Sequence, residues 1–125
     1  MAVVNRRYVQ SVLVALVYAC AGAVMAQDMA AVSPSTTKVL IDKPDVRVME
    51  VNVKPGEGIP MHSHPENVVY FVTGGKIKTT TSDGKVTEVT RKPGEVMWSA
   101  PITHKNENVG TTEEKVIVIE LKSAK

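Results

Sequence analysis

Apolar and polar residues alternate in short segments along most of the chain after residue 37, which is the pattern of β-strands with one buried face. A phase change at Val48-Met49 predicts a β-bulge. Asp83-Gly84, between two alternating segments, predicts a hairpin turn. No ten-residue window after residue 26 shows helical spacing, so the expected fold is all-β, a sandwich or barrel. Strands are predicted at residues 39–41, 46–53, 68–72, 76–81, 85–90 and 116–121.

The first 26 residues have a different composition from the rest of the chain. Arg6 and Arg7 form a short basic head, and an apolar run follows at residues 12–25. The run ends in Val24-Met25-Ala26, which supplies small residues where a signal peptidase cleaves. This apolar run is shorter than a membrane span, which needs about 20 apolar residues. Residues 1–26 are therefore expected to be a signal peptide, and the mature protein to be periplasmic or secreted and free of the membrane.

Two other fates of this leader stay open. The segment ending at Cys20 faintly resembles the site at which bacterial lipoproteins are acylated, which would make Cys20 the lipidated mature N-terminus. The leader would otherwise stay in place as an N-terminal membrane anchor. Cleavage after Ala26 leaves a flexible lead-in at residues 27–37, which lack periodicity, and a single domain at residues 38–125.

Cleavage also removes the excess of positive charge. The whole chain has 15 basic and 13 acidic side chains, and Arg6 and Arg7 belong to the leader, so the mature chain has 13 of each. It has no dense cluster of Lys and Arg interleaved with aromatic residues that would neutralise phosphates. Nucleic acid is therefore not the expected partner.

Two predicted strands, residues 68–72 and 116–119, are apolar at every position and so have two apolar faces. One face can fill a core, and the other is expected to be covered by a second sheet or a second subunit. We expect a homodimer, with residues 116–121 or the neighbouring N-terminal strand in its interface. Met61 and Trp98 are expected to pack in the core.

The mature chain has three histidines, in two separate segments. His62 and His64 are two residues apart, which on a strand places both side chains on one face, roughly 6.6 Å apart along the chain. His104 follows about forty residues later, after the predicted hairpin. An antiparallel barrel can return that strand to a position beside the first, so the three histidines are expected to share one pocket.

The segments around these histidines resemble the two motifs of the cupin superfamily. Gly56-x5-His62-x-His64 is similar to the first motif, and residues 94–108, with His104 near their end, are similar to the second. The resemblance implies a small single-domain cupin, whose fold is a double-stranded β-helix, or jelly-roll barrel. It also implies a divalent metal ion, Fe, Zn, Mn, Ni or Cu, held by His62, His64 and His104.

The chain departs from the cupin pattern at the glutamate that usually joins the three histidines. Its place falls on Val68, or on Asn67 if the segment is one residue shorter, whereas Glu66 follows Pro65 in a different register. Whether Glu66 or Asn67 replaces the glutamate is left open. Three neutral imidazoles without a carboxylate suit Zn²⁺ with a bound water, or the three-histidine iron of some cupin dioxygenases.

The resemblance leaves the function open among three alternatives. A metal held by three histidines keeps open positions, so one alternative is a metal-dependent enzyme, dioxygenase-like or related, acting on a small molecule in the barrel. The missing carboxylate and the lack of an identifiable acid or base favour a non-catalytic metal- or small-ligand-binding protein. The third is a structural cupin with a vacant barrel. The fold hosts all three, and no catalytic residue is assigned.

Overall fold

The computed structural model describes residues 27–123 of the chain. The expected signal peptide and the alternative acylation site at Cys20 lie outside the described residues. Within residues 27–123, no helix has the length and apolar character needed to cross a membrane.

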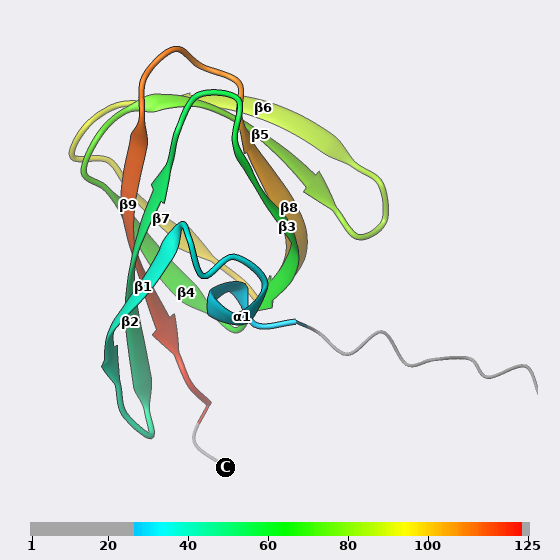
Figure 1. The fold of residues 1–125 in the computed structure, drawn as a ribbon. Coiled ribbons are helices and arrows are strands. Elements are labelled where there is room, and N and C mark those ends of the chain that lie inside the picture. The colour runs from blue at the N-terminus through cyan, green and yellow to red at the C-terminus, as the bar shows by residue number, and fades with distance from the viewer. Residues whose placement is uncertain (1–26, 124–125) are drawn as a thin grey trace, which may run out of the picture.

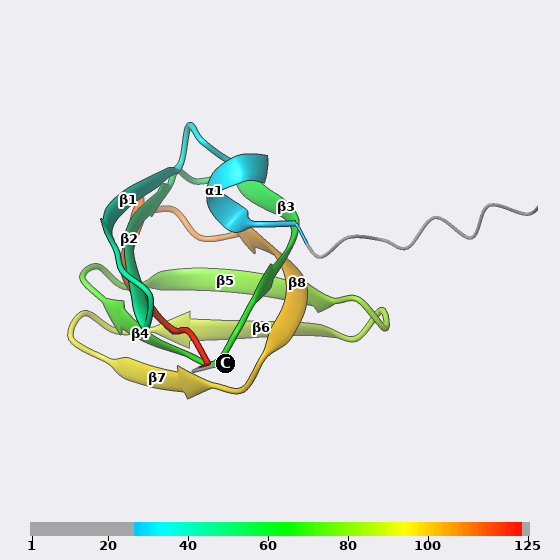
Figure 2. The ribbon, with the colours of Figure 1, turned by 90° about the horizontal axis from the view of Figure 1, so that it is seen from below.

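The described chain forms two antiparallel sheets that face each other and enclose the core, a jelly-roll barrel (Figures 1 and 2). The expected all-β fold is confirmed. One sheet has the strand order β1-β2-β9-β4-β7 and the other has the order β3-β8-β5-β6. The elements are α1 (Met29–Val32), β1 (Thr37–Asp42), β2 (Val46–Val53), β3 (Gly58–His64), β4 (Asn67–Phe71), β5 (Gly75–Thr81), β6 (Val86–Arg91), β7 (Val96–Ser99), β8 (Ile102–Asn108) and β9 (Glu114–Leu121).

The expected hairpin joins β5 to β6. Thr81 N donates to Lys85 O over 2.9 Å, and Asp83 Oδ1 accepts from Lys85 N over 3.2 Å. Gly84 has φ +88°, a left-handed conformation that side chains with a Cβ rarely adopt. The Asp-Gly pair therefore supplies both the turn geometry and its stabilising hydrogen bond.

The expected bulge at Val48-Met49 lies on the opposite strand. Val39 of β1 pairs with Met49, and Ile41 pairs with Val48, so Leu40 is the extra residue. On its other side β2 pairs with β9 without a register shift. Because β1 is an edge strand, a bulge there interrupts one ladder, whereas a bulge in β2 would interrupt two.

The expectation of a flexible lead-in at residues 27–37 is corrected by the structure. Asp28 Oδ1 accepts from Ala30 N over 3.3 Å and caps α1, and Met29 enters the hydrophobic core with only 2% of its surface exposed. Ser63 N donates to Gln27 O over 2.9 Å, which ties the segment to β3. A single helical turn is too short to show apolar periodicity, so the sequence pattern did not indicate it.

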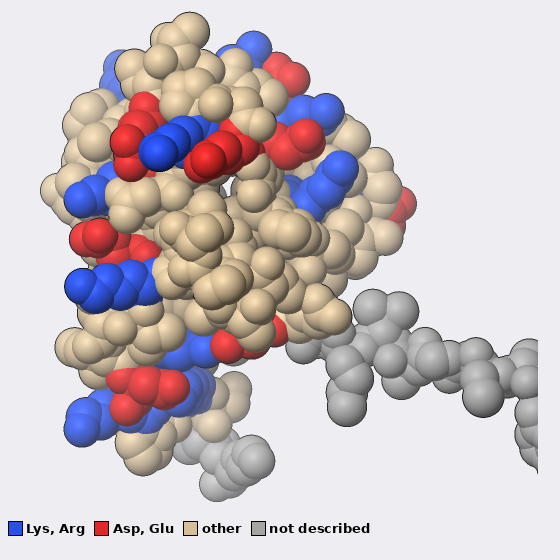
Figure 3. Space-filling view, in the orientation of Figure 1, with Lys and Arg blue, Asp and Glu red and all other residues tan. Residues whose placement is uncertain are grey.

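The core combines Met29 of α1 with inward-facing side chains of both sheets. Met49, Val51 and Val53 alternate on the inner face of β2. Met61 and Trp98, which were expected in this core, are 37% and 61% exposed, so that expectation was wrong. On the face in Figure 3, acidic and basic side chains lie in mixed groups rather than in a patch of one sign.

Candidate metal centre

The three histidines come together on two paired strands of one sheet. His62 of β3 is the direct register partner of His104 of β8, and His64 lies two residues further along β3. The ring centroids are 4.7 Å apart for His62–His64 and His62–His104, and 5.4 Å apart for His64–His104. One potential ligand atom from each ring lies within 4.8 Å of the others. The expected convergence of the three side chains is therefore present.

A bulge in β3 sets the direction of these side chains. Ile59 pairs with Asn106 and His62 pairs with His104, so β3 advances three residues while β8 advances two. Ile59 and His62 consequently both face the barrel interior, and Met61 turns outward. Pro60 in the bulge has no N–H to leave unpaired, and its carbonyl oxygen is free to meet His62.

Hydrogen bonds fix the proton position on two of the imidazoles. His62 Nδ1 lies 2.7 Å from Pro60 O, and His64 Nδ1 lies 2.7 Å from Glu120 Oε1. A carbonyl or an ionised carboxylate only accepts, so in both rings Nδ1–H is the donor. Nε2 of each neutral ring therefore carries a lone pair, which is the form that binds a metal.

Burial keeps His62 and His104 neutral. His62 is fully buried, and burial lowers its pKa to about 4. Burial, together with repulsion from the other two histidines, lowers the pKa of His104 to about 3. At neutral pH both side chains are therefore deprotonated and available as ligands.

Glu120 is a site residue that the sequence pattern did not indicate. It is 2% exposed, and its other oxygen, Oε2, accepts from Arg47 Nε over 2.8 Å. Burial would raise its pKa, but hydrogen bonds from His64 and Arg47 together hold that pKa below the usual range. Arg47 in turn donates to both carboxylate oxygens of Asp28, over 2.8 and 2.6 Å. The available signal was a lone acidic residue within the otherwise apolar segment 116–121.

The two candidates for the missing family glutamate point in different directions. Glu66 lies outside the histidine cluster, and its Oε1 accepts from Trp98 Nε1 over 2.8 Å. Asn67 is 2% exposed, lines the cavity beside His64, and is the register partner of Glu120. Asn67 therefore occupies the inward position on β4, and its amide donates to Pro65 O over 2.9 Å.

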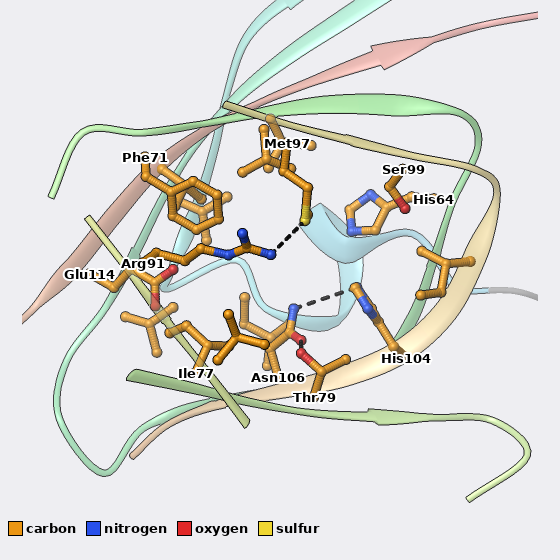
Figure 4. Close-up of a pocket in the computed structure, with 18 of the residues that line it drawn as sticks. His64, Phe71, Ile77, Thr79, Arg91, Met97, Ser99, His104, Asn106 and Glu114 are labelled. Carbon is orange, nitrogen blue, oxygen red and sulfur yellow. Dashed lines mark hydrogen bonds between the residues drawn. The ribbon is translucent and has the colours of Figure 1, made fainter. Parts of the chain in front are cut away.

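His64 and His104 line a cavity of about 280 Å³ inside the barrel. Figure 4 shows His64 and His104 at one side of it and Arg91, Phe71 and Glu114 at the other. Burial raises the pKa of Glu114 to about 7 despite the opposing charge of Arg91. The sequence pattern indicates no acid or base here, because the burial of Glu114 depends on the closed barrel.

The donor set fits a divalent metal ion. His62 Nε2 and His104 Nδ1 are buried and have no hydrogen-bond partner among the described residues. Buried polar atoms without partners are costly, and a cation would satisfy the lone pair of His62 Nε2. In His104 the lone pair is on Nε2, because the amide nitrogen of Asn106, 3.4 Å away, can only donate. Three imidazoles are a set suited to zinc, iron, copper or nickel.

The fold and this site define a small all-β barrel with a histidine cluster in its interior, and the comparisons with known proteins agree. A model of the cupin domain family matches residues 49–120, which is more than half of the chain. The chain therefore belongs to the cupin family. The search of curated proteins found no match.

Solved structures of bacterial and archaeal proteins share the fold. A cupin domain from Bordetella pertussis is 27% identical with a TM-score of 0.64, over 70% of this chain and 92% of that chain. A double-stranded β-helix protein from Klebsiella pneumoniae is 24% identical with a TM-score of 0.56, over 71% and 78%. An RmlC-like cupin from Methanocaldococcus jannaschii is 17% identical with a TM-score of 0.56, over 69% and 80%.

Proposed function

We propose that this protein is an exported metal-dependent cupin that holds a divalent ion through His62, His64 and His104 and acts on a small molecule in the barrel. The observation that carries the proposal is the convergence of three imidazoles beside a cavity, with one buried nitrogen of His62 and one of His104 left without a hydrogen-bond partner among residues 27–123. Bound there, a redox-active ion such as iron would suit dioxygenase-like chemistry, and zinc would supply a Lewis acid.

The residues of the chain prepare the site in three ways. Pro60 O and Glu120 orient the rings of His62 and His64. Apolar side chains such as Phe71 and Val118 line the cavity and limit the access of water. The strand pair β3–β8 holds the ligands on rigid elements rather than on loops.

A non-catalytic binding protein is the second candidate, and one observation favours it. Both oxygens of Glu120, the carboxylate beside the histidines, are already engaged by His64 and Arg47. Glu120 is therefore a positioning residue and not a free base. The two candidates differ in outcome: an enzyme would release a changed small molecule, and a binder would return it unchanged, which mass spectrometry of the ligand before and after incubation in air distinguishes.

The metal site is tested by replacing His104 with alanine and measuring metal content by elemental analysis. Two imidazoles bind an ion more weakly than three, so His104→Ala should lose the metal and melt at a lower temperature. Chelator should lower the melting temperature of the wild type in the same way. Glu66→Gln, outside the cluster, is the matched control and should keep the metal. Full metal content in His104→Ala would contradict a shared site.

Export and assembly are proposed on separate grounds. We propose cleavage after Ala26 because residues 1–26 have the composition of a signal peptide. Mass spectrometry of the native protein should find Gln27 at the N-terminus, whereas a lipidated Cys20 would contradict it.

We also propose a homodimer, because the outer face of the five-stranded sheet exposes apolar side chains, including Tyr70 and Val96.

A further inference from the structure

Arg91, at the end of β6, extends its guanidinium into the cavity from the side opposite His64 and His104 (Figure 4). Its side chain is 29% exposed, and the guanidinium carbon lies 5.3 Å from the centroid of the Phe71 ring. An aromatic ring at that distance attracts a cation and restricts its position. Arg91 is therefore held with its charged end facing the histidines across the cavity.

Most of the N–H groups of Arg91 have no good acceptor among residues 27–123. Nη2 lies 3.2 Å from Met97 Sδ, and a thioether sulfur is a weak acceptor. Nη1 lies 3.8 Å from Glu95 Oε2, beyond hydrogen-bond distance. A guanidinium has five N–H donors in a planar fork, so this one retains the capacity to bind a planar anion with two parallel hydrogen bonds.

The acidic groups near the cavity offset this charge only in part. Glu95, the carboxylate paired with Arg91, is 37% exposed, and at 3.8 Å the pairing is long and screened by water. The pKa of Glu114 is raised by burial to about 7, so near neutral pH much of this side chain is protonated and neutral. Glu107 also lines the cavity, and its Oε2 lies 3.6 Å from Lys78 Nζ, which offsets its charge. The end of the cavity at Arg91 therefore favours an anion.

We propose that the cavity binds a small monocarboxylate with an apolar body, whose acid group pairs with Arg91 while its other end faces the histidines. This inference deepens the proposed function by naming the class of molecule that the site takes, and it rests on that function for the role of the histidines. A carboxylate fits the guanidinium fork. A phosphate dianion would need further cations, and Arg91 is the only lysine or arginine that lines the cavity in the described part of the chain.

The walls between the two ends set the size and character of the ligand. They are largely aliphatic, and a volume of about 280 Å³ is just below the range of small-molecule sites, roughly 300–1,000 Å³. An acid with a short hydrocarbon chain therefore matches the cavity in charge, polarity and size. The apolar wall residues include Val69, Ile77, Val89, Ile102 and Val118.

The test uses calorimetric titration of the purified protein with a series of acids from acetate to hexanoate, and with butanamide as the uncharged analogue of butanoate. Each titration is performed on zinc-loaded and on chelator-treated, metal-free protein. Arg91→Met removes the charge but keeps an aliphatic stem of similar length. Arg91→Lys keeps the charge without the fork. Lys92→Met removes a positive charge from the exposed neighbouring residue and is the matched control.

Wild-type protein should bind at least one acid of the series, and butanoate at least about tenfold more tightly than butanamide. Arg91→Met should weaken acid binding at least about tenfold in both metal states, Arg91→Lys should weaken it less, and Lys92→Met should leave it unchanged. The inference is overturned if no acid binds, if butanamide binds as well as butanoate, or if Arg91→Met binds like the wild type. If Arg91→Met does not fold, the inference is still tested by the comparison of butanoate with butanamide and by the Arg91→Lys variant.

The two metal states separate this inference from the proposed function. A protein that takes up no zinc but binds acids through Arg91 would refute the metal site and retain the carboxylate site. A protein that holds zinc and binds acids equally well without Arg91 would refute the carboxylate site and retain the metal site.

Discussion

His64 Nδ1 donates a 2.7 Å hydrogen bond to Glu120 Oε1, which links β3 to a strand 56 residues later in the chain. The second oxygen of the same carboxylate accepts from Arg47 of β2, and Arg47 also binds Asp28 beside α1. The orientation of one histidine of the cluster therefore depends on three other elements of the barrel. A carboxylate partner at Nδ1 also makes the imidazole a stronger ligand at Nε2.

Glu120→Gln tests this link. Glutamine keeps the volume and can still accept from His64, but it removes the negative charge that strengthens the histidine as a ligand. We expect the affinity for zinc to fall about 10- to 100-fold, measured by competition with a chromophoric chelator. Glu66→Gln makes the same chemical change outside the cluster and should bind zinc like the wild type. Equal affinity in both variants would show that Glu120 has only a structural role.

The fold and the three histidines could be predicted from the sequence because both follow from local patterns. Alternation with period two marked the strands, and the spacing of His62 and His64 placed them on one face. The prediction that His104 lies beside them depended on the order of the two motifs along the chain. The register pair His62–His104 confirms that position.

The parts that could not be predicted depend on contacts between distant segments. In the sequence, Glu120 is one polar residue in an apolar strand. Only the pairing of β9 with β2 and β4 brings it close to Arg47 and His64. The outward turn of Met61 follows from the bulge at Pro60-Met61, which alternation alone does not show. Contacts of this kind are set by tertiary packing, which overrides local preference.

Met29→Ala tests whether the segment before β1 is part of the folded domain. Met29 is 2% exposed and contacts the core, so the truncation should leave a cavity and lower the free energy of unfolding by about 2–4 kcal/mol. Met61→Ala, at a position that is 37% exposed, is the matched control and should cost about 1 kcal/mol or less. Urea denaturation of both variants measures the difference, and equal losses would mean that the segment is not packed in solution.

Glu114→Gln tests the buried acid through the pH dependence of stability. The folded pKa of about 7 lies above the unfolded value of 4.5, so the folded state holds the proton more tightly. Stability from this group is therefore complete below about pH 4.5 and is lost as pH rises through 7. Glutamine removes that loss, and the variant should gain up to about 3 kcal/mol relative to the wild type between pH 4.5 and pH 8. The exposed Glu113→Gln should show no such gain, and parallel pH profiles for all three proteins would refute the raised pKa.

The outer face of the five-stranded sheet has apolar side chains in two neighbouring rows, the second of which ends at Glu50 of β2. In register order, Val48 pairs with Ile119, Ile119 with Val68, and in the next row Ile117 pairs with Tyr70 and Tyr70 with Val96. β9 lies inside the sheet, with β2 and β4 on its two sides, so it can reach a partner only through its outward side chains, which include Ile117, Ile119 and Leu121. The interface expected at residues 116–121 is therefore one in which a second copy covers the outer face of the sheet and does not pair with an edge strand.

Val96→Glu tests this interface. Val96 is 65% exposed in the single chain, so a charge there should leave the monomer folded, whereas in a dimer it would be buried without a partner. We expect the wild type to sediment as a dimer at micromolar concentration and Val96→Glu to shift to monomer, with circular dichroism unchanged. Val86→Glu, at a 53% exposed valine of β6 in the other sheet, makes the same change outside the face and should remain dimeric. A wild type that sediments as a monomer, or equal dissociation in both variants, would rule out the outer face as the contact between copies.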